Sequence, residues 1–301
     1  MLTISLQQRL FENTVKLQIP PEEIIKLYVL ERLLWRVSQF AAAEQMIARG
    51  SLITRNWILP AILRGEDFRP VQDLDLMAVY PFDMERGKDF FKKIFSIQSD
   101  DGVEIINKNF ETIVTWGDTP NPGIRTTLNI ALISYIVSIQ IDMGFNDPLV
   151  PAATWYAYQG LLPENHFSIV VPTPELACAW KLHGLFEFQG IAGKTWKLKD
   201  LYDIYLILKY KSLNMDTLSS AIRVAFEDRK TPFKCYKVIL ENQFGQSNKR
   251  LRAWRKLNEK WQNRITHPSH LILLRYIRQF IDPIFMELIS ETSLEQSNQL
   301  N

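Results

Sequence analysis

The chain predicts an α+β protein with a mixed or largely antiparallel sheet in an N-terminal lobe and a helical C-terminal lobe. Residues 21–48 have the apolar spacing of a long amphipathic helix, and residues 103–142 carry short alternating segments typical of strands. From Pro174 onward the pattern is helical almost throughout. A run of strands that follows helices favours segregated layers over regularly alternating βαβ units.

Local signals support each element in turn. Pro20 and Pro21 open the first long helix, and Glu22 and Glu23 complement the positive end of its dipole. Turn residues at 118–123 separate two of the strands. The remaining predictions are a strand over 69–79, a short helix over 90–97, and strands over 103–107, 111–116, 125–130 and 136–142.

Composition sets the class of protein. With 301 residues, 47% hydrophobic and 23% charged, the chain can bury a sizeable core and resembles an ordinary soluble protein. Pro172 and Pro174 predict a junction between domains 1–170 and 171–301. We expect no membrane partner and a cytoplasmic location, because no apolar run of 18 residues and no secretory pattern is found, and because Cys178 and Cys235 have the context of reduced core thiols.

Asp73 and Asp75 are the most informative pair in the sequence. They lie two residues apart in a predicted strand, so both carboxylates point to the same face. Adjacent carboxylates repel unless a cation lies between them, and Mg²⁺ binds both carboxylates and phosphates. The pair indicates metal-assisted phosphoryl or nucleotidyl transfer, whereas a solvated acidic edge is the simpler alternative.

Two further segments flank this pair. Gly50-Ser51 opens a predicted helix and could present N–H groups and a hydroxyl to a phosphate, or form an ordinary turn. Asp142 ends a predicted strand and could complete a two-metal site as its third carboxylate, or cap the turn at Gly144.

Two predicted helices beyond Pro174 carry charged candidates. Lys181 lies among apolar residues, so its ammonium group either snorkels to solvent or meets a phosphate. Asp200 and Asp203 share one face of the next helix. Surface ion pairs with Lys197 or Lys199, or a helix cap by Asp200, are the alternatives.

The order of these motifs resembles the AbiEii/AbiGii-type nucleotidyltransferase toxins, a family of the DNA polymerase β-like superfamily. The resemblance spans residues 30–285 and is carried by these segments: Gly50-Ser51, Arg69, Asp73-x-Asp75, Asp142, the Glu-x5-Lys segment from Glu175 to Lys181, and the Lys-Asp-Leu-Tyr-Asp run from Lys199 to Asp203. It implies a nucleotidyltransferase-like N-terminal lobe, Mg²⁺ as cofactor and an NTP as substrate.

The resemblance also implies residue roles. Asp73, Asp75 and Asp142 would hold the metal, with Asp142 as a candidate base. Gly50 and Ser51 would hold the nucleotide phosphates, Lys181 would contact the triphosphate, and Asp203 or Asp200 would support the site. Members of the family act as toxins of toxin–antitoxin or abortive-infection systems, and some modify the 3′ ends of tRNA.

Charge is distributed unevenly along the chain. Residues 229–279 carry 13 basic and two acidic residues, a net +11, while the rest of the chain is about −9 because 22 basic and 31 acidic residues remain. In 249–261 one helical stripe holds Leu251, Trp254, Leu257 or Asn258, and Trp261, and the basic residues occupy the rest. We expect the tryptophans to lie in the core and the basic face to bind RNA or an acidic partner such as an antitoxin.

Three functions remain open from the sequence. The first is a Mg²⁺-dependent nucleotidyltransferase that modifies RNA, expected to be tRNA, as a toxin. The second is a nucleotidyltransferase that modifies a small molecule such as an antibiotic, which the basic C-terminal lobe disfavours. The third is a non-catalytic relative that binds RNA or a partner protein, which the intact acidic residues disfavour.

Overall fold

The computed structural model describes residues 5–106, 110–117, 121–186, 197–236, 248–261, 265 and 269–298. The chain forms two compact units. The first consists of Met1–Glu66, Pro70–Asp147 and Ala152–Pro172, and the second of Asp67–Arg69, Pro148–Pro151 and Thr173–Asn301.

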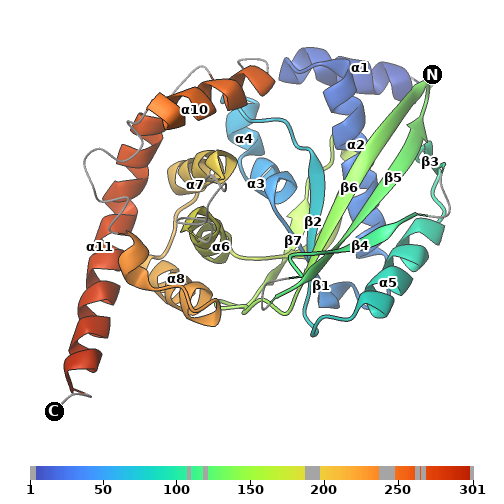
Figure 1. Cartoon of the computed structure of the whole chain (residues 1–301). Coiled ribbons are helices and arrows are strands. Elements are labelled where there is room, and N and C mark those ends of the chain that lie inside the picture. The colour runs from blue at the N-terminus through green and yellow to red at the C-terminus, as the bar shows by residue number, and fades with distance from the viewer. Residues whose placement is uncertain are drawn as a thin grey trace. The chain divides into compact units, whose positions relative to one another are not determined.

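A mixed six-stranded sheet forms the centre of the first unit (Figure 1). Its strands are β1 (Met46–Arg49), β2 (Asp73–Ala78), β3 (Val103–Ile105), β4 (Thr112–Thr115), β5 (Gly123–Leu132) and β6 (Tyr135–Phe145). They follow the order β1-β2-β6-β5-β3, and β4 also pairs with β5. Within this sheet β2 and β6 run parallel and the other pairings are antiparallel, which confirms the predicted mixed sheet.

Helices and a second, small sheet complete this unit. The helices are α1 (Leu6–Leu17), α2 (Pro21–Ser38), α3 (Ser51–Trp57), α4 (Leu59–Ile62) and α5 (Met84–Ser96), and β7 (Thr154–Tyr158) pairs with β8 (Phe167–Val171). Helix α2 packs against β2, β5 and β6 and against α5. Its apolar residues, such as Leu30 and Leu33, are fully buried, so this face of the sheet is part of the core.

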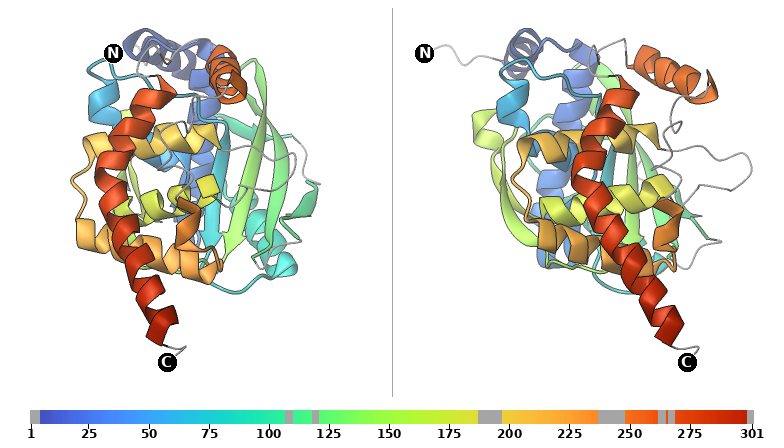
Figure 2. Two further views of the ribbon diagram at one scale, coloured as in Figure 1. Left: turned by 60° about the vertical axis from the view of Figure 1, so that its left-hand side comes forward. Right: turned by 90° about the vertical axis from the view of Figure 1, so that its left-hand side faces the viewer.

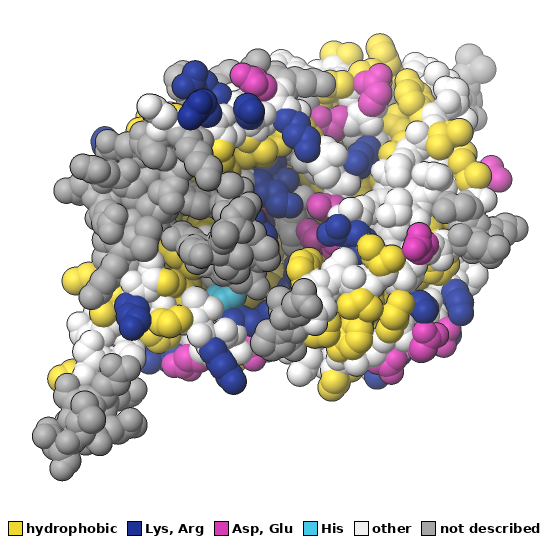
Figure 3. All heavy atoms as spheres, in the orientation of Figure 1, with side chains coloured by type: hydrophobic (Ala, Val, Ile, Leu, Met, Phe, Trp, Pro, Cys, Tyr) yellow, Lys and Arg dark blue, Asp and Glu magenta, His cyan; other side chains and the backbone are white. Residues whose placement is uncertain are grey.

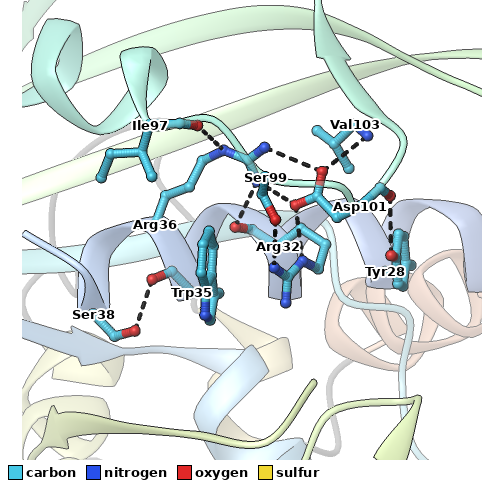
Figure 4. Close-up of polar contacts among 9 residues, drawn as sticks. All are labelled: Tyr28, Arg32, Trp35, Arg36, Ser38, Ile97, Ser99, Asp101 and Val103. Atoms are coloured by element: carbon cyan, nitrogen blue, oxygen red, sulfur yellow. Dashed lines mark hydrogen bonds and ion pairs between the residues drawn. The ribbon is translucent and has the colours of Figure 1, made fainter. Parts of the chain in front are cut away.

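A buried ion-pair cluster holds the segment after α5 against helix α2 (Figure 4). Asp101 accepts hydrogen bonds from Arg32 Nε at 2.9 Å and from Arg36 Nη1 at 2.7 Å. The backbone carbonyl of Asp101 also accepts a bond from Tyr28. Because all three charged side chains are buried, loss of one partner would leave an uncompensated charge inside the unit.

The predicted helix over 21–48 is too long. Helix α2 ends at Ser38, a short 3₁₀ helix follows at Ala43–Gln45, and residues 46–49 form strand β1. The alanines at 41–43 favour a helix locally, but pairing of Met46–Arg49 with β2 recruits this stretch into the sheet. Helix α5 starts six residues before the predicted 90–97, and strands β7 and β8 were not predicted.

The second unit is helical, as predicted from Pro174 onward. Its helices are α6 (Pro174–Phe186), α7 (Leu198–Tyr210), α8 (Met215–Asp228), α10 (Asn248–Lys260) and α11 (His270–Asn298), with a 3₁₀ helix at Phe233–Tyr236. Helix α6 packs against α7 and α8, and α11 packs along α7 (Figure 2). The rings of Phe186, Phe226 and Phe285 meet in its core.

Trp254 of α10 and Trp261, the residue that follows this helix, are both buried, as expected. Trp254 is 8% and Trp261 6% exposed, and their rings meet edge to face. Cys178 is buried and Cys235 partly buried, and both are free thiols. In the part of the chain that the structure describes, no helix is both long and apolar enough to cross a bilayer.

Candidate metal and nucleotide site

Three carboxylates meet on the central sheet. Asp73 and Asp75 lie on β2 and Asp142 lies on β6, and one oxygen of each lies within 4.8 Å of the others. Asp142 is buried, whereas Asp73 and Asp75 are partly exposed. The group offers hard oxygen ligands at a spacing that one or two Mg²⁺ ions can bridge.

Strand pairing explains why these residues meet. Asp73 and Asp75 share a face because side chains alternate along a strand. Asp75 is paired with Asp142 in the parallel register of β2 and β6, so Asp142 points to the same side of the sheet. Strand β6 continues to Phe145, three residues beyond the predicted end. Asp142 is therefore a mid-strand residue, and the alternative that it caps a turn at Gly144 is wrong.

Asp142 is held by two side chains that the sequence analysis did not identify. Arg125 on β5 donates from Nε to Oδ1 at 2.7 Å and from Nη2 to Oδ2 at 3.0 Å. Gln140, two residues before Asp142, donates from Nε2 to Oδ2 at 3.1 Å. The hydrogen bond to Asp142, together with the charges of Asp73 and Asp75, raises the pKa of Arg125 despite its partial burial.

The register of the β5–β6 hairpin could have indicated Arg125. Leu132 pairs with Tyr135, so only Ile133 and Ser134 form the loop, and the antiparallel register then places Arg125 opposite Asp142. Both strands were predicted, but neither loop residue is a Gly, Asn or Asp, so the sequence did not mark this turn.

The Gly50-Ser51 step lies against the triad. As predicted, it opens a helix, with Ser51 as the first residue of α3. Gly50 has φ +82° and ψ −159°, and a Cβ at this position would lie 2.0 Å from Asp75 Oδ2. The side chain of Ser51 is buried, and its Oγ has no hydrogen-bond partner among the described residues. A buried hydroxyl in this state is a donor for a bound anion.

Lys181 and the two carboxylates of α7 meet within the second unit. Lys181 Nζ donates to Asp203 Oδ2 at 2.7 Å and lies 3.5 Å from Asp200 Oδ1. Arg69 binds the same Asp203 bidentately, from Nε at 2.8 Å and Nη2 at 2.7 Å. The Lys181 side chain is 11% exposed, so it does not snorkel, and Asp200 pairs with it and does not cap α7.

The charges in this cluster reinforce one another. Burial alone would raise the pKa of Asp203, but Arg69 and Lys181 outweigh burial and hold that pKa well below its ordinary value. Burial alone would lower the pKa of Lys181, yet Asp203 and Asp200 raise it. Asp203 and Lys181 therefore stay charged over a wide pH range.

Comparison with known families decides the assignment. The model of the family described as "Nucleotidyl transferase AbiEii toxin, Type IV TA system" matches residues 61–280, well over half of the chain. The chain belongs to the AbiEii family. It is therefore a nucleotidyltransferase, which confirms the resemblance drawn from the sequence. The matched range holds Arg69, the three triad residues and the Lys181 cluster, while Gly50 and Ser51 lie before it.

Two solved structures are similar to this AbiEii-family chain. JHP933 from Helicobacter pylori is 12% identical, with 92% of this chain and 98% of that chain covered and a TM-score of 0.44. A protein from the same species assigned as a nucleotidyltransferase is 13% identical, with 90% and 97% covered and a TM-score of 0.46. No curated protein sequence matches the chain.

Proposed function

We propose that the protein is a Mg²⁺-dependent toxin that transfers a nucleotide from an NTP to an RNA acceptor, with tRNA as the expected acceptor. The observation that carries this proposal is the triad of Asp73, Asp75 and Asp142, whose oxygens lie within 4.8 Å of one another. Nucleotidyltransferase activity follows from the AbiEii family, and the metal, the acceptor and the residue roles are the proposal.

Each triad residue acts as a metal ligand in this proposal. A divalent cation bound there would neutralise charge on the phosphates and promote ionisation of the attacking hydroxyl. Asp73 and Asp75 present their carboxylates from one strand, so a single rigid element fixes their spacing. Asp142 is oriented by Arg125 and Gln140, which leave part of its acceptor capacity free for a metal.

Ser51 and Gly50 are the proposed contacts for nucleotide phosphates. The unpartnered Oγ of Ser51 can donate to a phosphate oxygen without giving up a bond within the described part of the protein. Gly50 allows the backbone to approach Asp75, so phosphate and metal ligands lie side by side in this unit.

Lys181 is the proposed contact for the triphosphate. Its ammonium group has three donors, and the hydrogen bond to Asp203 uses one of them. Asp203, fixed by Arg69, holds the ammonium group in place, and Asp200 lies on its other side at 3.5 Å. Asp203 and Asp200 are thus proposed as supports of Lys181.

The basic face of α10 is the proposed acceptor surface. It consists of Arg252, Arg255, Lys256 and Lys260, which are all exposed, and Figure 3 shows Lys and Arg side chains gathered where Figure 1 places α10. Within the described part of the chain these four side chains form no ion pair, so their charge is available to an RNA backbone. The side chains of Lys249 and Arg250 lie outside the described residues.

An acidic antitoxin protein is the second candidate partner for this face, since type IV toxin–antitoxin systems give the family its description. A small-molecule acceptor is the alternative for the reaction itself. Positively charged acceptors, such as aminoglycosides, would be repelled by a basic surface.

The experiment that tests the proposal is incubation of the protein with each labelled NTP in turn, Mg²⁺ and total tRNA. A labelled RNA product that requires Mg²⁺ and is lost in Asp75→Asn supports the proposal. Label in protein alone, or in a small acceptor alone, would contradict the RNA acceptor. Undiminished transfer in the presence of a chelator would contradict the metal.

A further inference from the structure

Arg125 is a cation already bound to the triad. It faces Asp142 across the β5–β6 hairpin and binds both oxygens of that carboxylate. The bidentate contact fixes the planes of the two groups relative to each other. Orienting Asp142 is one role of this side chain, and the effect of its charge on a metal ion is a second, separate one.

The guanidinium group interacts with all three carboxylates of the triad. Its hydrogen bond to Asp142 is the strongest of these interactions, and Asp73 and Asp75 act on it through their charges. The charge of Lys26 also interacts with that of Asp73, but Lys26 Nζ donates its hydrogen bond to Gln72 Oε1 at 3.0 Å. Arg125 directly contacts a triad carboxylate, because it forms an ion pair with both oxygens of Asp142.

We propose that Arg125 is a resident counter-ion of the triad and lowers the affinity of this site for a divalent cation when no nucleotide is bound. The inference rests on the metal site proposed above. A metal ion that enters the site meets a guanidinium group of like charge, which competes with it for the oxygens of Asp142.

The physical basis is the permanent charge of arginine. A guanidinium group does not lose its proton in a protein, so its repulsion of a metal ion persists at every working pH. The side chain is 35% exposed, which lets it move toward solvent without leaving an isolated buried cation. At an effective dielectric constant of about 20, a unit charge a few ångströms away changes the affinity for a divalent cation by tenfold or more.

The test measures Mn²⁺ binding to the full chain without nucleotide. The electron paramagnetic resonance signal of free Mn²⁺ reports how much of the metal remains unbound. Arg125→Met and Arg125→Gln remove the charge, and Gln retains a donor for Asp142. Arg125→Lys keeps the charge but not the planar fork. We expect the two neutral variants to bind Mn²⁺ about tenfold more tightly and the Lys variant to stay within about threefold of the wild type.

Arg86→Gln is the matched control, because it removes one positive charge from the same unit at a side chain that binds Gln45 and packs on Tyr80. It should leave Mn²⁺ affinity unchanged. Thermal denaturation of each variant separates an effect on folding from an effect on the site.

Two results would overturn the inference in different ways. Unchanged or weaker Mn²⁺ binding in both neutral variants, with binding still lost in Asp75→Asn, rejects the role of Arg125 and leaves the metal site standing. No saturable Mn²⁺ binding in the wild type, or full binding in Asp75→Asn, rejects the metal site and the inference together.

Discussion

Gly50 and Asp75 approach each other so closely that a methyl group on Gly50 would lie 2.0 Å from Asp75 Oδ2. Gly50 belongs to the segment between β1 and α3, and Asp75 lies on the neighbouring strand β2. The glycine thus places the proposed phosphate-binding residues, Gly50 and Ser51, next to the proposed metal ligands. Its backbone angles lie in a region that residues with a Cβ rarely adopt.

We expect Gly50→Ala to reduce both stability and metal binding. Backbone strain alone costs about 1–3 kcal/mol, and the clash must displace the Asp75 carboxylate. Gly65→Ala is a matched control, because Gly65 also has a positive φ but a Cβ there would meet nothing within 4 Å. Chemical denaturation and Mn²⁺ titration are the measurements. Equal loss of Mn²⁺ affinity in both variants would contradict the specific link to Asp75.

We expect Asp73→Asn and Asp75→Asn to reduce nucleotide transfer strongly while the fold is retained. Loss of one ligand should reduce transfer on the order of 100-fold or more. Thermal denaturation and circular dichroism of the metal-free variants check that the fold is retained. Asp89→Asn, at an exposed ion pair with Lys92, is the control and should transfer normally. Wild-type rates in both site variants would exclude this triad.

We expect Lys181→Ala to weaken NTP use more than RNA binding. A hydrogen bond from a charged group contributes about 1.5–3 kcal/mol, so the KM for NTP should rise about tenfold or more. The same variant should lose stability, because Asp203 is fully buried and would keep, among the described residues, the ion pair with Arg69 alone. Lys209→Ala removes an exposed lysine that packs on the rings of α7 and is the control. An unchanged KM with lowered stability would mark Lys181 as purely structural.

Stability should depend on pH through Glu31. Burial is the main cause that raises the pKa of this carboxyl from 4.5 to about 7, although Leu161 N and Tyr158 Oη donate hydrogen bonds to it. The folded state therefore keeps its proton where the unfolded state has lost it. The free energy of unfolding should fall as the pH rises from 4.5 to about 7 and then level off.

Glu31→Gln should remove this dependence, because an amide does not ionise. Across that window the free energy of unfolding of the variant should rise relative to that of the wild type by up to about 3 kcal/mol, at 1.36 kcal/mol per pKa unit. Chemical denaturation at a series of pH values on both sides of the window measures the difference. A constant difference between the two proteins would contradict the raised pKa.

Reversal of three charges on α10 should weaken RNA binding and flatten its salt dependence. In Arg252→Glu, Arg255→Glu and Lys256→Glu combined, each lost phosphate contact should lower the slope of log affinity against log salt by about 0.7–0.9. The buried Trp254 and Trp261 are untouched, so the helix should still pack.

The control for this reversal is a triple variant of α5, with Lys88, Lys92 and Lys93 changed to Glu, which alters the net charge equally. Parallel salt slopes for the wild type and the α10 variant would reject the RNA surface. An acidic partner protein would then be the better explanation of the charge.

Local patterns in the sequence determined those features of the protein that depend on neighbouring residues. The alternation of a strand is enough to place Asp73 and Asp75 on one face, whereas Gly50-Ser51 left a helix start and an ordinary turn both open. The spacing of Trp254 and Trp261 likewise predicted which side of α10 is buried. These features depend on chain stereochemistry within a few residues, so they need no knowledge of the fold.

Tertiary structure decided which distant residues meet. Asp142 joins the pair on β2 only because β6 lies beside β2 in a parallel register, and Arg125 reaches Asp142 only through the register of the β5–β6 hairpin. Arg69 reaches Asp203 across 134 positions of sequence. Such contacts follow from the hydrogen bonding of whole strands and the packing of buried faces, which short-range periodicity does not encode. The same sheet pairing overrode local helical preference at Met46–Arg49 and made it strand β1.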